Sequence, residues 1–384
     1  MADMRIPFFK PAISEDDIDA VVDAMRSGWI TSGPNVQALE AELAAYTGAG
    51  YANAVNSCTA ALHLALAAWG IGPGDEVIVP VYTFSATANV VLHCGATPVL
   101  VDVRDSDANM DPAAFEKAIT RQTKAVIPVD FGGEPCDMAA IITIARRHGL
   151  KVLSDSAHSV GSLYRGRPVG SIADATALSF YATKNMTTGE GGALLTDDPE
   201  LSDRVRMLTL HGITKDGWGR YTAGGTWRYD IAEFGFKDNL TDIAAALGRS
   251  QLRRLETFNE DRDRVAARYL ANLRDEEHLI LPSINEANRR VWHIFMVRVR
   301  NQQSPVPRDE VIKKLAERGI QTSVHFIPLH YFTAYQRYGN WKPGDFPVAE
   351  HIFDGAISLP IFPEMTDAQV DEVCQALREI LHPR

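Results

Sequence analysis

The chain has 384 residues, 46% of them hydrophobic and 23% charged, which is the balance of an ordinary globular protein with one large or two moderate domains. Its net charge is −11 and it has no basic block, which argues against nucleic acid or an anionic membrane as the main partner. No apolar run is long enough to span a membrane, and the first residues lack the apolar stretch of a signal peptide. We therefore expect a cytoplasmic protein.

The four cysteines, Cys58, Cys94, Cys136 and Cys374, lie far apart, and none belongs to a C-x-x-C pair. This spacing argues against a zinc ribbon and against a thioredoxin-type redox site. We expect reduced cysteines, as in the cytosol, and no metal site.

Strands and helices alternate through the first part of the chain. The expected helices cover 14–27, 36–46, a segment that ends near 69, 85–94, 112–119 and 138–148. The expected strands begin with a short segment after 52 and then cover 76–81, 98–103, 125–129, 151–153 and 175–180. This alternation predicts an α/β fold with a mostly parallel, doubly wound sheet.

The pattern changes after residue 212. Residues 212–237 mix glycines with aromatic residues, which predicts a long functional loop, and a helix is expected at 241–258. Alternation at 291–299 predicts a half-buried antiparallel strand, and helices are expected at 308–318 and 367–381. We predict a large domain at 1–250, whose N-terminal helix can pack on the second domain, and a smaller α+β domain at 251–384.

One lysine stands out in the segment that runs from Ser179 to Gly192. Lys184 directly follows the apolar strand expected at 175–180, and the glycines after it let the backbone turn tightly and approach a ligand. In α/β enzymes the chemistry lies beyond the carboxyl ends of parallel strands. A single lysine is more often an exposed surface residue, so the interpretation of Lys184 depends on its partners.

Three other segments supply such partners. Asp155 ends a predicted buried strand, where a carboxylate needs a cation, and 57–59 opens a helix whose free N–H groups form an anion site. The aromatic residues in 82–85 lie at a strand-to-helix junction, where one can stack on a flat ligand. Each segment alone has a commoner structural explanation, but together with a lysine able to form a Schiff base they describe a pyridoxal 5'-phosphate site.

These residues lie in longer blocks, such as Ala-Thr-Lys-Asn-Met-Thr-Thr-Gly-Glu-Gly-Gly at 182–192 and Asp-Ser-Ala-His at 155–158. On them the chain resembles the nucleotide-sugar aminotransferases, the DegT/StrS-type family of fold-type I pyridoxal-phosphate enzymes. Further matching segments lie at 27–34, 56–63, 82–89, 95–99 and 235–242. The resemblance covers nearly the whole chain and implies the fold type I architecture.

The resemblance also implies a cofactor site. Lys184 is expected to bind pyridoxal 5'-phosphate covalently, and Asp155 to keep the pyridine nitrogen protonated. The other implied cofactor contacts are the backbone amides of Cys58 and Thr59, the ring of Phe84, His158, the Ser179 hydroxyl and, reaching into the neighbouring subunit, Asn239. The family often has Gly at position 58 and His at position 181, where this chain has Cys58 and Tyr181.

The implied reaction moves an amino group from L-glutamate to a keto group of a nucleotide-linked sugar in a homodimer with shared sites. The expected position is C4 of a UDP-4-keto-pentose or an NDP-4-keto-6-deoxyhexose, for cell-surface glycans such as lipopolysaccharide or for antibiotic sugars. Amination at C3 is the alternative, and an inactive family member acting as a regulator is a more distant one. A nicotinamide-dependent oxidoreductase is disfavoured because no G-x-G-x-x-G turn is present. The expected substrate contacts are Trp29 and Tyr221 beside the sugar or base, His325 at the sugar, and Arg220 and Arg228 at the nucleotide diphosphate.

Overall fold

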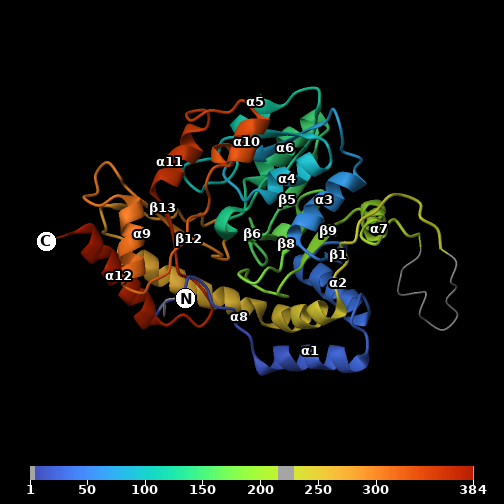
Figure 1. Cartoon of the computed structure of the whole chain (residues 1–384), viewed down its shortest axis with the longest axis horizontal. Helices are drawn as coiled ribbons and strands as arrows, with labels where there is room; N and C mark the ends of the chain where they lie inside the picture. Colours follow the sequence, from blue (N-terminus) through green and yellow to red (C-terminus); the bar gives the residue numbers. More distant parts are fainter. Residues whose placement is uncertain (1–4, 215–228, 384) are drawn as a thin grey trace.

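The computed structural model describes residues 5–214 and 229–383. A seven-stranded sheet in the order β1-β9-β8-β5-β4-β2-β3 forms its centre. The long helix α8 (Asp242–Leu273) runs from this part of the chain toward the C-terminal elements (Figure 1). The strands of the sheet are β1 (Tyr51–Val55), β2 (Glu76–Pro80), β3 (Thr97–Val101), β4 (Thr123–Val126), β5 (Lys151–Asp155), β8 (Ala175–Ser179) and β9 (Gly192–Thr196). β9 runs antiparallel to β1 and β8, and all other pairs in this sheet are parallel, so the predicted mostly parallel sheet is confirmed.

The sheet is buried on both faces. Val77 and Val79 of β2 belong to one hydrophobic core, and Ile78 between them belongs to another. Successive side chains of a strand point to opposite faces, so a continuous apolar strand needs helices on both sides. The helices of this part are α1 (Glu15–Ser27), α2 (Pro34–Thr47), α3 (Cys58–Ala68), α4 (Ala86–His93), α5 (Pro112–Ala118), α6 (Met138–His148) and α7 (Pro199–Leu208).

The longest helix, α8 (Asp242–Leu273), has 32 residues and starts at Thr241, whose hydroxyl accepts a hydrogen bond from the Ala244 amide at 3.2 Å. The predicted end near residue 258 is wrong. Phe258, Val265 and Tyr269 are all buried and recur at helical spacing, so an apolar stripe continues through the charged segment that suggested a stop. The helix also runs through the predicted boundary at residue 250, so the division into two domains stays a prediction.

A second hydrophobic core begins at Val265 and reaches to Leu381, and Ile6 from the N-terminal segment joins it. Its sheet, in the order β10-β12-β13, contains β10 (Leu279–Ile280), β12 (Phe295–Val299) and β13 (Ala356–Leu359). The antiparallel strand predicted at 291–299 is confirmed but begins later, at Phe295, because Trp292 has a φ of 33° that an extended strand cannot contain.

The elements not yet named include the C-terminal helix, which supplies much of the second core. The remaining helices are α9 (Arg308–Glu317), α10 (Thr333–Tyr338), α11 (Pro347–Gly355) and α12 (Asp367–Leu381), and the remaining strands are β6 (Leu163–Tyr164), β7 (Arg167–Pro168) and β11 (Asn288–Arg289).

The first helix, α1, packs along α8, where the buried Asp17 carboxylate accepts hydrogen bonds from Gln251 at 2.8 Å and Arg254 at 2.9 Å. Among the described residues, no helix combines the length and apolarity that crossing a membrane requires.

Candidate active site

The carboxyl ends of β1, β2, β5 and β8 meet at one edge of the large sheet, and β9 begins there. Gly192 pairs with Val55 on one side and with Ser179 on the other, so the start of α3, which follows β1, lies next to Ser179. A Cβ atom on Gly192 would lie 2.6 Å from the backbone nitrogen of Cys58. The close approach of β9 to the first turn of α3 therefore requires glycine at this position.

A cavity of about 490 Å³ opens at this edge, which is the size of an ordinary cofactor or ligand site. Eight of the predicted site residues line it, namely Cys58, Thr59, Phe84, Asp155, His158, Ser179, Lys184 and His325. The fold thus brings together segments that are separated by more than two hundred residues.

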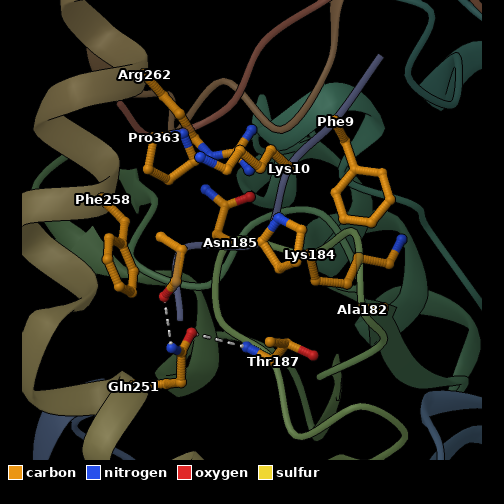
Figure 2. Close-up of a pocket in the computed structure, with 12 residues that line it drawn as sticks. Phe9, Lys10, Ala182, Lys184, Asn185, Thr187, Gln251, Phe258, Arg262 and Pro363 are labelled. Carbon is orange, nitrogen blue, oxygen red and sulfur yellow. Dashed lines mark hydrogen bonds between the residues drawn. The ribbon is translucent and has the colours of Figure 1, made fainter. Parts of the chain in front are cut away.

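Lys184 lies on a loop that α8 holds in place (Figure 2). The amide of Thr187 donates to the Gln251 side chain at 3.4 Å, and Asn185 donates to the Asn259 side chain at 2.7 Å. Burial lowers the pKa of the Lys184 ammonium to about 8, although the nearby Cys58 and Asp155 act in the opposite direction. A substantial fraction of the amine is therefore neutral near physiological pH, as a nucleophile or base requires.

The Asp155 carboxyl is only 5% exposed and lacks a cationic hydrogen-bond partner in the described part of the chain. Thr87 donates to it at 2.8 Å and the Ala157 amide at 3.3 Å, and the Cys58 thiol lies 3.8 Å away. Burial raises the pKa of this carboxyl, and the hydrogen bonds from Thr87 and Ala157 oppose the rise. A protonated pyridine nitrogen in the cavity would supply the missing positive charge, so Asp155 fits pyridoxal phosphate.

Three histidines line the same cavity, and two of them, His158 and His293, are buried. The rings of His158 and His293 lie 4.5 Å apart, and burial, followed by the charge of Lys184, lowers the pKa of both and of His325, which falls to about 4. Nδ1 of His158 accepts a hydrogen bond from the Gly132 amide at 3.3 Å, which leaves the proton of the neutral ring on Nε2. That nitrogen is then able to donate to an oxygen of a bound ring.

The prediction from the sequence missed His293. This residue is 8% exposed, and its Nδ1 atom is buried without a hydrogen-bond partner among the described residues. The available signal was its position in the alternating segment 291–299, on the same side as Phe295 and Val297. A histidine on an otherwise apolar face needs a polar partner, and a ligand bound in the cavity would supply one.

The first turn of α3 and Ser179 form a small anion site. The Ser57 hydroxyl accepts from the Ala60 amide at 3.0 Å and caps the helix. The amides of Cys58 and Thr59 lie in the first turn, where N–H groups have no acceptor within the helix. With the 7% exposed Ser179 beside them, these donors fit the phosphate of the cofactor.

Other predicted contacts lie elsewhere. Trp29 and Asn239 are not among the described residues that line the cavity. Asn239 pairs with Val55 and donates to the Ser32 hydroxyl at 2.7 Å. Its predicted role in the neighbouring subunit therefore stays a prediction. The remaining predicted substrate contacts, Arg220, Tyr221 and Arg228, lie outside the described residues.

Known proteins resemble this chain in sequence and structure over nearly its whole length. The spore coat polysaccharide biosynthesis protein SpsC of Bacillus subtilis (strain 168) is 48% identical over 377 residues, which is 98% of this chain and 97% of SpsC. The PMP-form of Spr1654, a candidate sugar aminotransferase from Streptococcus pneumoniae, has a TM-score of 0.92 and 37% identity over 98% of this chain and 99% of its own. DesV of S. venezuelae has a TM-score of 0.90 and 36% identity over 99% of both chains.

The model of the DegT/DnrJ/EryC1/StrS aminotransferase family matches residues 11–378. Together with the solved PLP-form of Spr1654, this match confirms the predicted enzyme class, a pyridoxal-phosphate-dependent aminotransferase of fold type I. The chain therefore belongs to the DegT/DnrJ/EryC1/StrS aminotransferase family.

Proposed function

We propose that this enzyme transfers the amino group of L-glutamate to a keto group of a nucleotide-linked sugar, using pyridoxal 5'-phosphate bound covalently to Lys184. The observation that carries this proposal is the convergence of Lys184, Asp155 and the start of α3 on one cavity. A sugar acceptor is supported by the names of two similar proteins, a polysaccharide biosynthesis protein and a candidate sugar aminotransferase.

The chain's own groups divide the work of the reaction. The bound cofactor supplies an electron sink for the carbon that loses its proton. Nζ of Lys184, once free and neutral, takes that proton and returns it at the position required for amino transfer. Asp155 holds the ring nitrogen protonated, and Thr87 keeps the carboxylate oriented through its 2.8 Å hydrogen bond.

We propose C4 of a 4-keto sugar as the acceptor position. The support comes from the segment at 27–34 and from the aromatic segment within 212–237, which most resemble those of enzymes that aminate C4. His325, the expected sugar contact that lines the cavity, is held by a 2.9 Å hydrogen bond between Nδ1 and the Ser358 hydroxyl and by stacking on Phe8. Such a fixed imidazole suits the positioning of a sugar hydroxyl or keto group.

We also propose that the enzyme works as a homodimer whose subunits complete each other's sites. Phe84 and Tyr181 line the cavity, yet their side chains are 63% and 46% exposed in the single chain. Phe234, near the end of the aromatic segment, is 99% exposed. Large exposed aromatic side chains beside a functional cavity commonly mark an interface with another protein chain.

Borohydride reduction tests the covalent link. Reduction of the cofactor-loaded enzyme should fix one pyridoxyl group on Lys184, which peptide mass spectrometry locates. The Lys184→Ala variant should fold, bind little cofactor and form no such adduct. A single adduct on another lysine would contradict the assignment.

A substrate screen tests the acceptor. UDP- and dTDP-linked sugars with a 4-keto or a 3-keto group are incubated with the enzyme and L-glutamate, and the position of the new amine is read by NMR. We expect amination at C4 and formation of 2-oxoglutarate. Amination at C3 would leave the enzyme class intact and overturn only the proposed position.

A further inference from the structure

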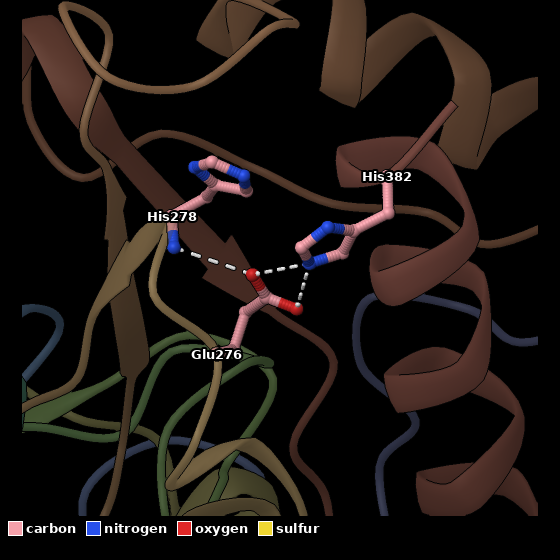
Figure 3. Close-up of side chains that lie close together, drawn as sticks. All are labelled: Glu276, His278 and His382. Atoms are coloured by element: carbon pink, nitrogen blue, oxygen red, sulfur yellow. Dashed lines mark hydrogen bonds and ion pairs between the residues drawn. The ribbon is translucent and has the colours of Figure 1, made fainter. Parts of the chain in front are cut away.

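We propose that Glu276, His278 and His382 form a binding site for one Zn²⁺ ion in the C-terminal part of the chain (Figure 3). One potential ligand atom of each residue lies within 4.8 Å of the other two. Two imidazoles and one carboxylate, with an open position for water, are a ligand set that zinc accepts readily, whereas magnesium and calcium prefer oxygen ligands alone. None of the three residues lines the cofactor cavity.

The three side chains come from two elements that are distant in the sequence. Glu276 and His278 lie in the turn between α8 and β10, and His382 directly follows α12. The backbone of the turn is fixed, because the His278 amide donates to Glu276 Oε1 at 3.2 Å and the His278 carbonyl accepts from the Arg300 amide at 2.9 Å. Two of the three ligands are thus held in place before any ion binds.

The spacing of the carboxylate and one imidazole already suits a metal. Nε2 of His382 lies 3.0 Å and 3.2 Å from the two oxygens of Glu276. Two ligand atoms that are each about 2.1 Å from a tetrahedral zinc ion stand about 3.4 Å apart. The ring centroids of His278 and His382 lie 4.9 Å apart, so both imidazoles stand close enough together to share one ion with Glu276.

The surroundings leave polar groups that an ion would satisfy. The Glu276 side chain is almost buried, and in the described residues it meets His382 and a backbone amide but no arginine or lysine. Nδ1 of His278 is buried and has no hydrogen-bond partner in the same part of the chain. Burying a carboxylate and an imidazole nitrogen without full compensation costs free energy, which a divalent cation would recover. The half-exposed side chain of His382 gives an ion access from solvent.

An ion coordinated by these three residues would cross-link the end of α12 to the turn between α8 and β10. The site would therefore stabilise the second core rather than take part in amino transfer. The expectation from the sequence that the chain has no metal site rested on cysteine spacing, which does not reveal ligands 106 positions apart. The alternative is a plain ion pair between Glu276 and His382, and the experiments below separate the two.

Zinc titration of the tag-free, chelator-treated, cofactor-loaded enzyme tests the proposal. We expect one Zn²⁺ per chain by calorimetry and a rise in Tm of about 5 °C at a hundredfold excess over Kd. Activity at saturating substrate should not change. His278→Gln and His382→Gln should each weaken zinc binding at least tenfold and lose the rise in Tm. His148→Gln, which alters an exposed histidine at the end of α6, is the matched control and should behave as the parent.

Two results would overturn the proposal. One is the absence of one-to-one zinc binding by the parent enzyme, and the other is unchanged binding by the variant that carries both substitutions. If the variants do not fold, anomalous diffraction at the zinc edge from crystals of the parent enzyme soaked in zinc chloride decides. A peak among Glu276, His278 and His382 supports the site, and its absence refutes it.

Discussion

At the scale of single residues, burial controls the chemistry of the cavity. It pushes Lys184 toward its neutral form and Asp155 toward protonation, while the three histidines of the cavity stay neutral. An aminotransferase needs a neutral lysine and an ionised aspartate at the same time. The positive charge of a protonated ring nitrogen would favour the ionised form of Asp155. Binding of the cofactor and ionisation of this carboxyl would therefore be coupled.

The lowered pKa of Lys184 predicts how the cofactor-free enzyme captures pyridoxal phosphate. Only the neutral amine attacks the aldehyde, so the capture rate should rise with pH around a midpoint of about 8. At pH 7 about a tenth of the amine would be neutral, against about 0.03% for a lysine with a pKa of 10.5. Stopped-flow absorbance between pH 6 and 10 measures this rate. A midpoint near 10 would show that Lys184 is not perturbed.

The lowered pKa values of the three histidines predict that none of them changes the rate of catalysis by titrating between pH 6 and 9. A histidine whose pKa is lowered stays neutral as the pH rises from 6 to 9, and His325 loses its proton near pH 4. The profile of kcat/KM should therefore show no ionisation near 6.5. An acid limb between pH 6 and 7 that disappears in His293→Gln would contradict this expectation.

The sequence was sufficient to predict that Lys184 and Asp155 lie in one cavity, because each follows or ends a predicted buried strand and such strand ends share one edge of the sheet. It did not reveal that His293 lines the same cavity or that Thr87 donates a hydrogen bond to Asp155. Their roles come from contacts across more than sixty residues of chain, which no local pattern encodes.

At the scale of elements, the close approach of β9 to the start of α3 depends on Gly192, which has no side chain. Gly192→Ala would place a Cβ atom 2.6 Å from the backbone of Ser57 and Cys58 and 2.7 Å from the Leu178 carbonyl. We expect a loss of about 1–3 kcal/mol in the free energy of unfolding, as for other overpacked sites. The affinity for pyridoxal phosphate should also fall, because the first turn of α3 must move.

Urea unfolding and cofactor titration measure these two effects. Gly72→Ala is the control, because a Cβ atom there meets only the Cys94 carbonyl oxygen at 3.7 Å, an ordinary contact. Parent-like stability and cofactor affinity in Gly192→Ala would show that the junction tolerates a methyl group.

Helix boundaries were predictable where the sequence carries strong end signals. The bounds predicted for α6 and α12 agree with the structure, since Asp137 caps one helix, Gly149 ends it, and Thr366 forms a capping box at the start of the other. α8 has no such stop signal at its predicted end, and α7 went unnoticed in spite of its cap by Asp198. Short elements such as β13 depend on their partner strands and could not be located from local pattern.

At the scale of the whole molecule, the proposed dimer makes a prediction about Phe234. Because this side chain is 99% exposed in the single chain, Phe234→Ser should leave the fold of the subunit intact while weakening association at least tenfold. Sedimentation velocity across a concentration series measures association. Ile284→Ser, at a 56% exposed position in the C-terminal part, is the control and should not change it. A Phe234→Ser enzyme that associates like the parent would place the interface elsewhere.

The arrangement of the sheet was predictable, because alternation of strands and helices allows few topologies. The relation between the two hydrophobic cores was not, since it depends on α8. Gln251 of this helix accepts a hydrogen bond from Thr187 in the loop that carries Lys184, while Arg262 donates to the Ile361 carbonyl at 3.0 Å, so one helix supports both that loop and the second core (Figure 2).

This shared helix restricts how the enzyme can change in length. Gln251 and Arg262 are eleven positions apart, which places them about 16 Å apart along the axis. A single inserted residue between them would rotate everything that follows by about 100° and carry Arg262 away from its partner. Insertions and deletions that keep both contacts must therefore fall outside the stretch of α8 between Gln251 and Arg262.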